Sequence, residues 1–108
     1  MDRTAEGGRR RAGIAEARPL RVRWSRRAET DLAGIFAYIA ADSEKSAARM
    51  VDGLYVAGES LVQFPHRGRP ARLSGRRELV VDANVITYRV KGDEVLILAV
   101  EHGARRKA

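Results

Sequence analysis

The sequence predicts an α+β fold of the order β-α-α-β-β-β, in which an α-helical hairpin packs on a small antiparallel sheet. Apolar residues follow a two-residue period near residue 20, a helical period in two successive stretches, and a two-residue period again in three runs after residue 77. Turn-forming residues separate the three late runs, so these strands should pair as successive hairpins. A chain of 108 residues suits one domain with one modest core, which two helices can cover from one side of a sheet.

The first strand is expected just before the helices. Leu20, Val22 and Trp24 alternate with Arg21 and Arg23, which is the period of a half-buried strand.

Two helices are expected next. The hydroxyl of Ser25 can cap the first, and Asp42 and Ser43 interrupt its pattern and can cap the second. Pro65 ends the second helix, because proline cannot continue one. The first apolar stripe consists of Ala28, Leu32, Ile35, Phe36 and Ile39, and the second of Ala47, Val51, Leu54, Gly58 and Leu61. Helices joined by so few residues should form an antiparallel hairpin.

Two glycines interrupt the second helix. Gly53 and Gly58 each cost about 1 kcal/mol relative to alanine inside a helix. We expect a close approach of the first helix to offset this cost, since a glycine lets two backbones come near each other.

The remainder of the chain is expected to form a loop and three strands. The segment from His66 to Arg77 has no apolar period and contains Pro70 and two glycines, so it is interpreted as a loop. The expected strands are Glu78–Val81, Val85–Val90 and Glu94–Val100.

Residues 19–108 are expected to form the single domain. Residues 1–18 have no sustained period and are interpreted as a disordered basic arm or a mis-assigned start. The three arginines at positions 9–11 could touch nucleic acid, although a solvated tail is the favoured interpretation.

Composition excludes several classes of protein. The chain has no cysteine, which excludes disulfides, cysteine metal sites and a cysteine nucleophile. No apolar run approaches the roughly 18 residues of a membrane span, and the N-terminal arginines precede no apolar signal segment. We therefore expect a cytoplasmic protein with no membrane partner.

Charge is divided between the two halves of the fold. The net charge is +7, yet residues 28–62 carry six acidic side chains against two basic ones. Residues 64–108 carry ten basic against five acidic side chains, and five of the arginines fall between residues 67 and 77. This polarity favours an anionic or acidic partner on the loop and sheet side, the alternative being that the loop arginines are only solvated.

Known catalytic motifs are mostly missing. His66 and His102 are the only histidines, and the sequence has no metal-binding spacing, no phosphate-binding loop and no dinucleotide fingerprint, so neither a metal nor a cofactor is expected. A metal-free ribonuclease remains open, because it needs only proton-transfer groups and cations. The available set is Tyr88, Arg89, His102 and Arg105. Two of them have a structural alternative: Tyr88 can pack on the sheet, and His102 can hydrogen-bond locally after the last strand. Arg89 is expected on the opposite face of the strand from Tyr88, because strand side chains alternate.

Five aromatic side chains could stack on bases, but core packing is the favoured interpretation because they are scattered along the chain. They are Trp24, Phe36, Tyr38, Tyr55 and Phe64.

Several segments together resemble one family. The run from Val22 to Leu32 followed by residues 35–40 resembles the opening of ParE toxins, and residues 61–70 resemble the family's helix end and basic loop. Residues 77–81, 86–90 and 94–98, with the His102-Gly-Ala-Arg105 ending, resemble its last three strands. On this ordered set, the chain resembles the RelE/ParE toxin superfamily, and its ParE-like branch in particular.

The resemblance implies a β-α-α-β-β-β toxin of a type II toxin–antitoxin system, involved in growth arrest and plasmid stabilisation. It implies a cognate antitoxin, ParD-like or other, and contact with operator DNA only through that antitoxin. A ParE-like toxin is expected to inhibit DNA gyrase without catalysis; a ribosome-dependent mRNA endonuclease of the RelE type is the alternative. Two departures disfavour the nuclease: no lysine lies between Lys45 and Lys91, and Val85 stands where several ribonuclease relatives have a catalytic arginine.

Two sets of site residues follow. The expected target-binding residues are Arg67, Arg69, Arg72, Arg76, Arg77, His102 and Arg105, if the end of the last strand meets the basic loop at one edge of the sheet. The expected antitoxin-binding residues are Trp24, Leu32, Phe36, Ile39, Val51 and Leu54.

Overall fold

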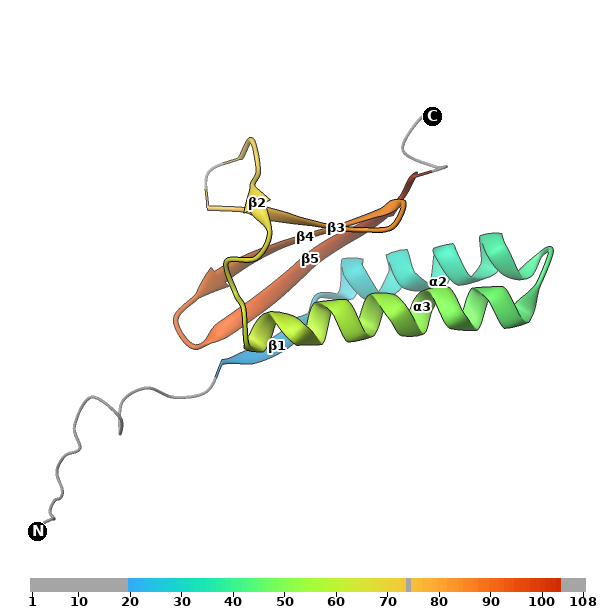
Figure 1. Ribbon diagram of the computed structural model, residues 1–108, viewed down its shortest axis with the longest axis horizontal. Helices are drawn as coiled ribbons and strands as arrows, with labels where there is room; N and C mark the ends of the chain where they lie inside the picture. Colours follow the sequence, from blue (N-terminus) through green and yellow to red (C-terminus); the bar gives the residue numbers. More distant parts are fainter. Residues whose placement is uncertain (1–19, 74, 104–108) are drawn as a thin grey trace, which may run out of the picture.

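Two helices lie against one face of a five-stranded sheet in the computed structural model, which describes residues 20–73 and 75–103 (Figure 1). The elements are β1 (Arg21–Trp24), α2 (Arg26–Ala40), α3 (Glu44–Glu59), a 3-10 turn η1 (Ser60–Val62), β2 (Arg69–Pro70), β3 (Arg77–Val81), β4 (Asn84–Lys91) and β5 (Glu94–His102). The predicted helical hairpin and the three late strands are confirmed, but α3 ends at Glu59 and passes into the 3-10 turn, short of the end predicted at Pro65. The interpretation of residues 1–18 as an arm lies outside the described residues.

The sheet has the strand order β1-β5-β4-β3-β2 and is mixed. The last three strands pair antiparallel, as predicted, but β1 pairs parallel with β5, from Arg21 opposite Glu94 to Trp24 opposite Ile97. The prediction of an antiparallel sheet is therefore wrong for β1. Figure 1 shows the reason: α2 continues in the direction of β1 and α3 returns, so the chain comes back to the end of the sheet at which β1 begins, and β3 starts there, nearer the opposite edge. After two hairpins, β5 runs the same way as β1.

A short strand lies within the segment expected to be only a loop. Arg69 and Pro70 pair antiparallel with Glu78 and Arg77 at the edge of the sheet. Proline is tolerated there because an edge strand has a neighbouring strand on one side only, so the missing backbone N–H need not be paired on the other side.

Both helices begin at the predicted caps. The hydroxyl of Ser25 accepts from the Ala28 amide at 3.0 Å, and that of Ser43 accepts from the Ser46 amide at 3.1 Å. Each bond satisfies an amide that would otherwise lack an intrahelical partner, which contributes about 1 kcal/mol.

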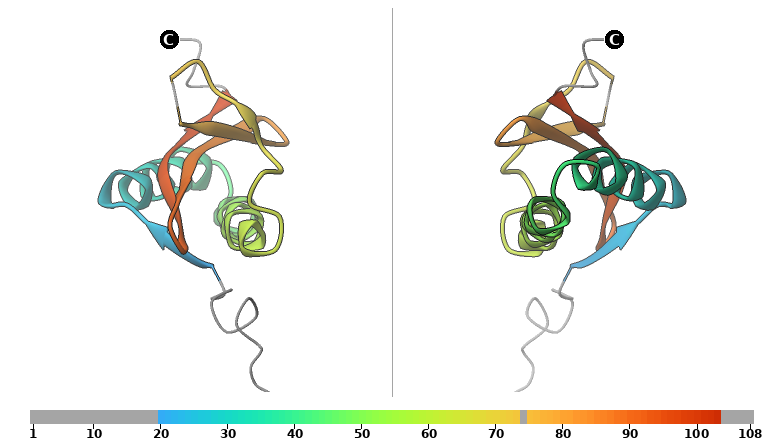
Figure 2. Two further views of the ribbon diagram at one scale, coloured as in Figure 1. Left: turned by 90° about the vertical axis from the view of Figure 1, so that its left-hand side faces the viewer. Right: turned by 90° about the vertical axis from the view of Figure 1, so that its right-hand side faces the viewer.

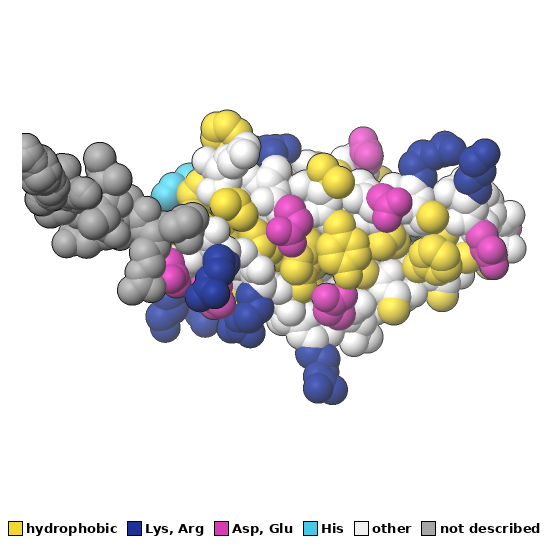
Figure 3. Space-filling model, turned by 90° about the horizontal axis from the view of Figure 1, so that it is seen from below, with side chains coloured by type: hydrophobic (Ala, Val, Ile, Leu, Met, Phe, Trp, Pro, Cys, Tyr) yellow, Lys and Arg dark blue, Asp and Glu magenta, His cyan; other side chains and the backbone are white. Residues whose placement is uncertain are grey.

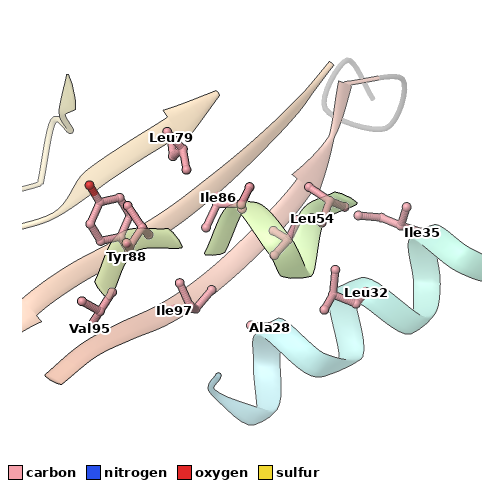
Figure 4. Close-up of a cluster of buried hydrophobic side chains, with 12 residues drawn as sticks. Ala28, Leu32, Ile35, Leu54, Leu79, Ile86, Tyr88, Val95 and Ile97 are labelled. Atoms are coloured by element: carbon pink, nitrogen blue, oxygen red, sulfur yellow. The ribbon is translucent and has the colours of Figure 1, made fainter. Parts of the chain in front are cut away.

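The core lies between the helical hairpin and the sheet (Figures 2 and 4). Ile35 of α2 and Leu54 of α3 are buried in one cluster with Ile86 of β4 and Ile97 of β5. Burial of a side chain of this size contributes roughly 1.5–3 kcal/mol. The remaining members are Ala28, Leu32, Ala57, Leu61, Leu79, Tyr88, Val95 and Val100.

The edge of β5 beyond β1 is covered by the start of α2. The backbone amide of Ser25 donates to the Ile97 carbonyl at 3.0 Å, and its hydroxyl donates to the Leu98 carbonyl at 3.0 Å. Further along the helix, the Asp31 carboxylate accepts from the Val100 amide at 2.9 Å. Helix α2 thus completes the hydrogen bonding that the four-residue β1 leaves unfinished.

Gly58 and Gly53 differ in their surroundings. A Cβ at Gly58 would lie 2.5 Å from Cζ2 of Trp24, so this glycine lets the indole ring of β1 lie against α3. Gly53 is exposed and a Cβ there would meet nothing within 4 Å. The expectation that both glycines serve helix–helix approach is therefore wrong: one accommodates a ring, and the other has no packing role.

These two glycines provide a matched pair of substitutions. Gly58→Ala should lower the free energy of unfolding by about 1–3 kcal/mol, because the added methyl group displaces the indole. Gly53→Ala should raise it by up to about 1 kcal/mol through helix propensity alone. Urea denaturation followed by circular dichroism measures both. Equal effects of the two substitutions would show that the Trp24 contact is easily relaxed.

Candidate functional site

The basic loop is held in shape by three of its own arginines. Nη1 of Arg67 donates to the Ser60 hydroxyl at 2.9 Å, and Arg69 forms an ion pair with Glu78 at 3.2 Å. Nη1 of Arg77 donates to the Gly68 carbonyl at 2.7 Å and to the His66 carbonyl at 3.4 Å. These three side chains therefore hold the loop in one conformation and also contribute to its positive charge.

Arg72 and Arg76 are exposed, and neither has a side-chain partner among residues 20–73 and 75–103. Of the five loop arginines, they are the ones whose guanidinium groups form no hydrogen bond or ion pair within the described part of the chain.

Tyr88 anchors this loop to the sheet. Its side chain is fully buried, and its hydroxyl donates to the Pro65 carbonyl at 2.8 Å and accepts from the Gly68 amide at 2.8 Å. A Cβ at Gly68 would lie 2.7 Å from that hydroxyl, so only glycine fits. Arg89 is exposed on the opposite face of β4, as predicted. Tyr88 thus packs on the sheet, and both hydrogen bonds of its hydroxyl group are made with the backbone of the loop.

His102 lies on the side of the sheet that faces the helices, opposite Asn84. Asn84 is fully buried, and its amide nitrogen donates to the Val81 carbonyl at 3.2 Å and contacts Sδ of Met50 at 3.0 Å. Its oxygen is therefore the acceptor for Nδ1 of His102, at 2.7 Å. Because an amide oxygen can only accept, Nδ1 of His102 carries the proton in this hydrogen bond. The ring of Tyr38, from α2, lies 5.8 Å away between centroids.

The register separates His102 from the basic loop. His102 is level with Asn84 and Val81 at one end of the β3–β4 hairpin, whereas Arg77 is level with Tyr88 at the other end. The expected meeting of the last strand with the basic loop at one edge is therefore wrong for His102. Arg105 lies outside the described residues. Nor does the fold gather the possible nuclease set, since Tyr88 is buried, Arg89 points to the opposite face, and His102 lies at the far end.

The outer face of the helical hairpin carries a strip of apolar side chains bordered by acidic ones (Figure 3). Of the residues expected to bind an antitoxin, Phe36 is 37% exposed, and Trp24, Ile39 and Val51 are half-buried. Leu32 and Leu54 belong to the core and present almost no surface, because they occupy the centre of each apolar stripe. Sequence reasoning missed Val56, which is 70% exposed, and it assigned Tyr38, 54% exposed, to core packing.

Two acidic residues on this face are bonded to aromatic ones. The Tyr55 hydroxyl donates to Glu29 at 2.6 Å, and the indole nitrogen of Trp24 donates to Glu59 at 2.9 Å. The hydrogen bond to Glu29, assisted by burial and by the negative charge, raises the pKa of Tyr55 to about 12. The ring centroids of Trp24 and Tyr55 are 4.7 Å apart. Together these contacts connect β1, α2 and α3 at their surface.

Within residues 20–73 and 75–103, no three acidic or histidine side chains gather closely enough to hold a metal ion. No helix in the same described ranges is long and apolar enough to cross a membrane.

The arrangement of a helical hairpin on a twisted mixed sheet is that of RelE/ParE toxins. A solved structure of the chromosomal ParDE toxin–antitoxin system from P. aeruginosa superposes with a TM-score of 0.71 at 27% identity, covering 78% of this chain and 96% of that one. A chain of the RelBE2 toxin–antitoxin complex from Mycobacterium tuberculosis superposes with a TM-score of 0.56 at 26% identity, covering 79% and 99%.

Sequence comparison defines the family more narrowly. The family described as the ParE toxin of type II toxin–antitoxin systems, parDE, matches residues 22–107, and the chain belongs to this family. It is 42% identical over 84 residues to Y4kP of Sinorhizobium fredii, a protein assigned as a toxin, covering 76% of this chain and 86% of the relative. It is 40% identical over 84 residues to toxin RelE2 of Caulobacter vibrioides, covering 78% and 96%.

The Asn84–His102 contact is testable by substitution and by NMR. Asn84→Ala should lower the free energy of unfolding by about 1–3 kcal/mol, because it leaves the Nδ1 proton and the Val81 carbonyl without their partner. In the unaltered protein, ¹⁵N shifts should show His102 as the Nδ1–H tautomer, and the substitution should abolish that preference. Exposed His66 is the internal control, whose signals should not change. An Nε2–H tautomer of His102 in the unaltered protein would refute the assignment.

Proposed function

We propose that the protein is a cytoplasmic toxin that inhibits DNA gyrase by binding, and that a cognate antitoxin neutralises it. The observation that carries the choice of a binding inhibitor is the burial of Tyr88, whose hydroxyl is committed to Pro65 and Gly68. A phenol in that position has no access to a substrate phosphate, so it cannot transfer a proton in a cleavage step. Membership of the ParE family supports gyrase as the target.

The mRNA endonuclease of the RelE type is the second candidate. It is favoured by the 40% identity to a relative named RelE2. It would require a cleavage site without Tyr88 and without His102 beside the basic loop, using Arg89 and Arg105 with other groups. General acid–base catalysis needs such groups within hydrogen-bond reach of one phosphate.

The helical face is the proposed site of the antitoxin, ParD-like or other. The apolar strip along α2 and α3 suits an amphipathic helix laid along it, since such a helix buries its own apolar face in the same step (Figure 3). The two superposed structures come from toxin–antitoxin systems, which supports a partner of this kind. Contact with operator DNA would then be made by the antitoxin.

The gyrase proposal predicts a specific pattern of inhibition. Purified toxin should block supercoiling by gyrase and induce a DNA-damage response in cells, and mRNA should remain intact during translation. A supercoiling assay and primer extension on translated mRNA, run with the same preparation, measure the two activities. Cuts at codons in the ribosomal A site, with supercoiling unaffected, would instead establish the endonuclease.

The antitoxin proposal predicts separable effects of substitutions on the two faces. Phe36→Glu should weaken binding of the antitoxin encoded beside the toxin gene by at least about tenfold, because it places a charge in an apolar contact. Arg72→Gln, on the basic loop, is the control for the helical face and should leave the helix contact intact. Isothermal titration calorimetry gives both affinities. Unchanged binding by Phe36→Glu would place the antitoxin elsewhere.

A further inference from the structure

A cationic cleft lies where the basic loop meets the sheet. Its volume is about 210 Å³ and it is lined by His66, Pro70, Gly75, Arg76, Arg77 and Val90. Two arginines and a histidine thus face one small space, and none of the described residues that line it is acidic. Gly75 has a φ of +80°, which lets the loop turn at the wall of the cleft.

Arg77 is fixed in this cleft before any ligand arrives. Its Nη1 is held by the carbonyls of Gly68 and His66, while no described residue accepts from its Nε or Nη2. A guanidinium group held by one nitrogen can offer the others as a fork to two oxygens of one anion. Arg76 supplies a second, exposed guanidinium, whereas the charge of Arg69 is met by Glu78.

An exposed aromatic ring lies on the same stretch of chain. Phe64 is 61% exposed, against the expectation that it packs in the core, and it lines a neighbouring hollow of about 450 Å³ with Arg67 and His66. His66 lines both hollows, so the aromatic surface and the cationic cleft adjoin. Cationic groups beside an exposed ring are the combination that binds single-stranded nucleic acid, where phosphates meet the cations and bases stack on the ring.

We propose that this cleft binds a backbone phosphate of nucleic acid and that Phe64 stacks on an unpaired base next to it. An acidic peptide would use the arginines but would gain little from the exposed ring, so the combination favours nucleic acid. The proposal rests on the chemistry of the cleft and stands whichever enzyme the toxin inhibits. If gyrase is the target, the site would contact the DNA that gyrase holds.

Fluorescence anisotropy with the full chain tests the proposal, using a labelled oligothymidylate and a duplex of equal length over a range of salt concentrations. Arg76→Gln should weaken binding of the single strand several-fold and reduce the slope of log affinity against log salt by about 0.7–1. Phe64→Ala should weaken binding of the single strand much more than that of the duplex, because paired bases cannot stack on the ring. Arg26→Gln, an exposed arginine at the start of α2, removes the same charge on another element and should leave both affinities unchanged.

Besides a failure to bind the oligonucleotide, two outcomes would overturn the proposal. One is an equal loss of affinity for Arg76→Gln and Arg26→Gln, which would mean that binding follows net charge only. The other is displacement of the oligonucleotide by polyglutamate at equal charge concentration, which would assign the cleft to acidic peptides. Gyrase inhibition is measured separately. Oligonucleotide binding without inhibition would refute gyrase as the target and support the nucleic-acid site in the cleft. Inhibition without oligonucleotide binding would support gyrase as the target and refute the nucleic-acid site.

Discussion

Strand β5 has hydrogen-bonding partners along both edges, and the remaining elements are positioned by that requirement. Strand β4 occupies one edge over nearly its full length, and β1 occupies the first part of the other. Where β1 ends, Ser25 and Asp31 of α2 take over as partners. An unpaired buried backbone group would cost about 1–3 kcal/mol, so α2 has little freedom to shift along the sheet. Helix α3 then packs against α2, and the ring of Trp24 packs against α3 at Tyr55 and Gly58.

Burial of a phenol determines the character of the basic loop. A loop with five arginines and little apolar content would ordinarily be free to move, because it buries too little surface to hold one conformation. Tyr88 supplies the missing anchor through two backbone groups, and Gly68 permits the approach. Three arginines complete the arrangement from within the loop. A residue that looks like a catalytic group from its type alone therefore serves to present a fixed charged surface.

The sequence specified the local structure well and the long-range pairing poorly. Caps at Ser25 and Ser43 and the alternation in the last three strands depend on neighbouring residues, which sequence patterns record. Which strand pairs with β1, and in which direction, depends on the path of the chain through the helical hairpin. The residues of β1 themselves hold no information about that path. Strand β2 was missed because two residues, one of them proline, are too few to show a period.

The same distinction applies to the candidate site. Helical period identified Leu32 and Leu54 as apolar, but the centre of such a stripe faces the protein's own core. The residues at the flanks of the stripe, such as Phe36 and Tyr38, meet solvent. The Asn84–His102 pair left a weaker signal: Asn84 is on the same face of its strand as the buried Ile86 and Tyr88, and a buried polar residue requires a partner. The separation of His102 from the basic loop could be obtained only from the strand register.

The position of Trp24 has a practical consequence. It is the only tryptophan in the chain, and it lies where β1 and α3 meet, against Gly58 and beside Tyr55. Fluorescence excited selectively in the indole therefore reports on one contact, that between β1 and α3. A change in its emission records whether the first strand is seated against the second helix, at the edge of the sheet opposite the short strand of the basic loop. The protein thus carries its own optical marker for the side on which two helices and a parallel strand come together.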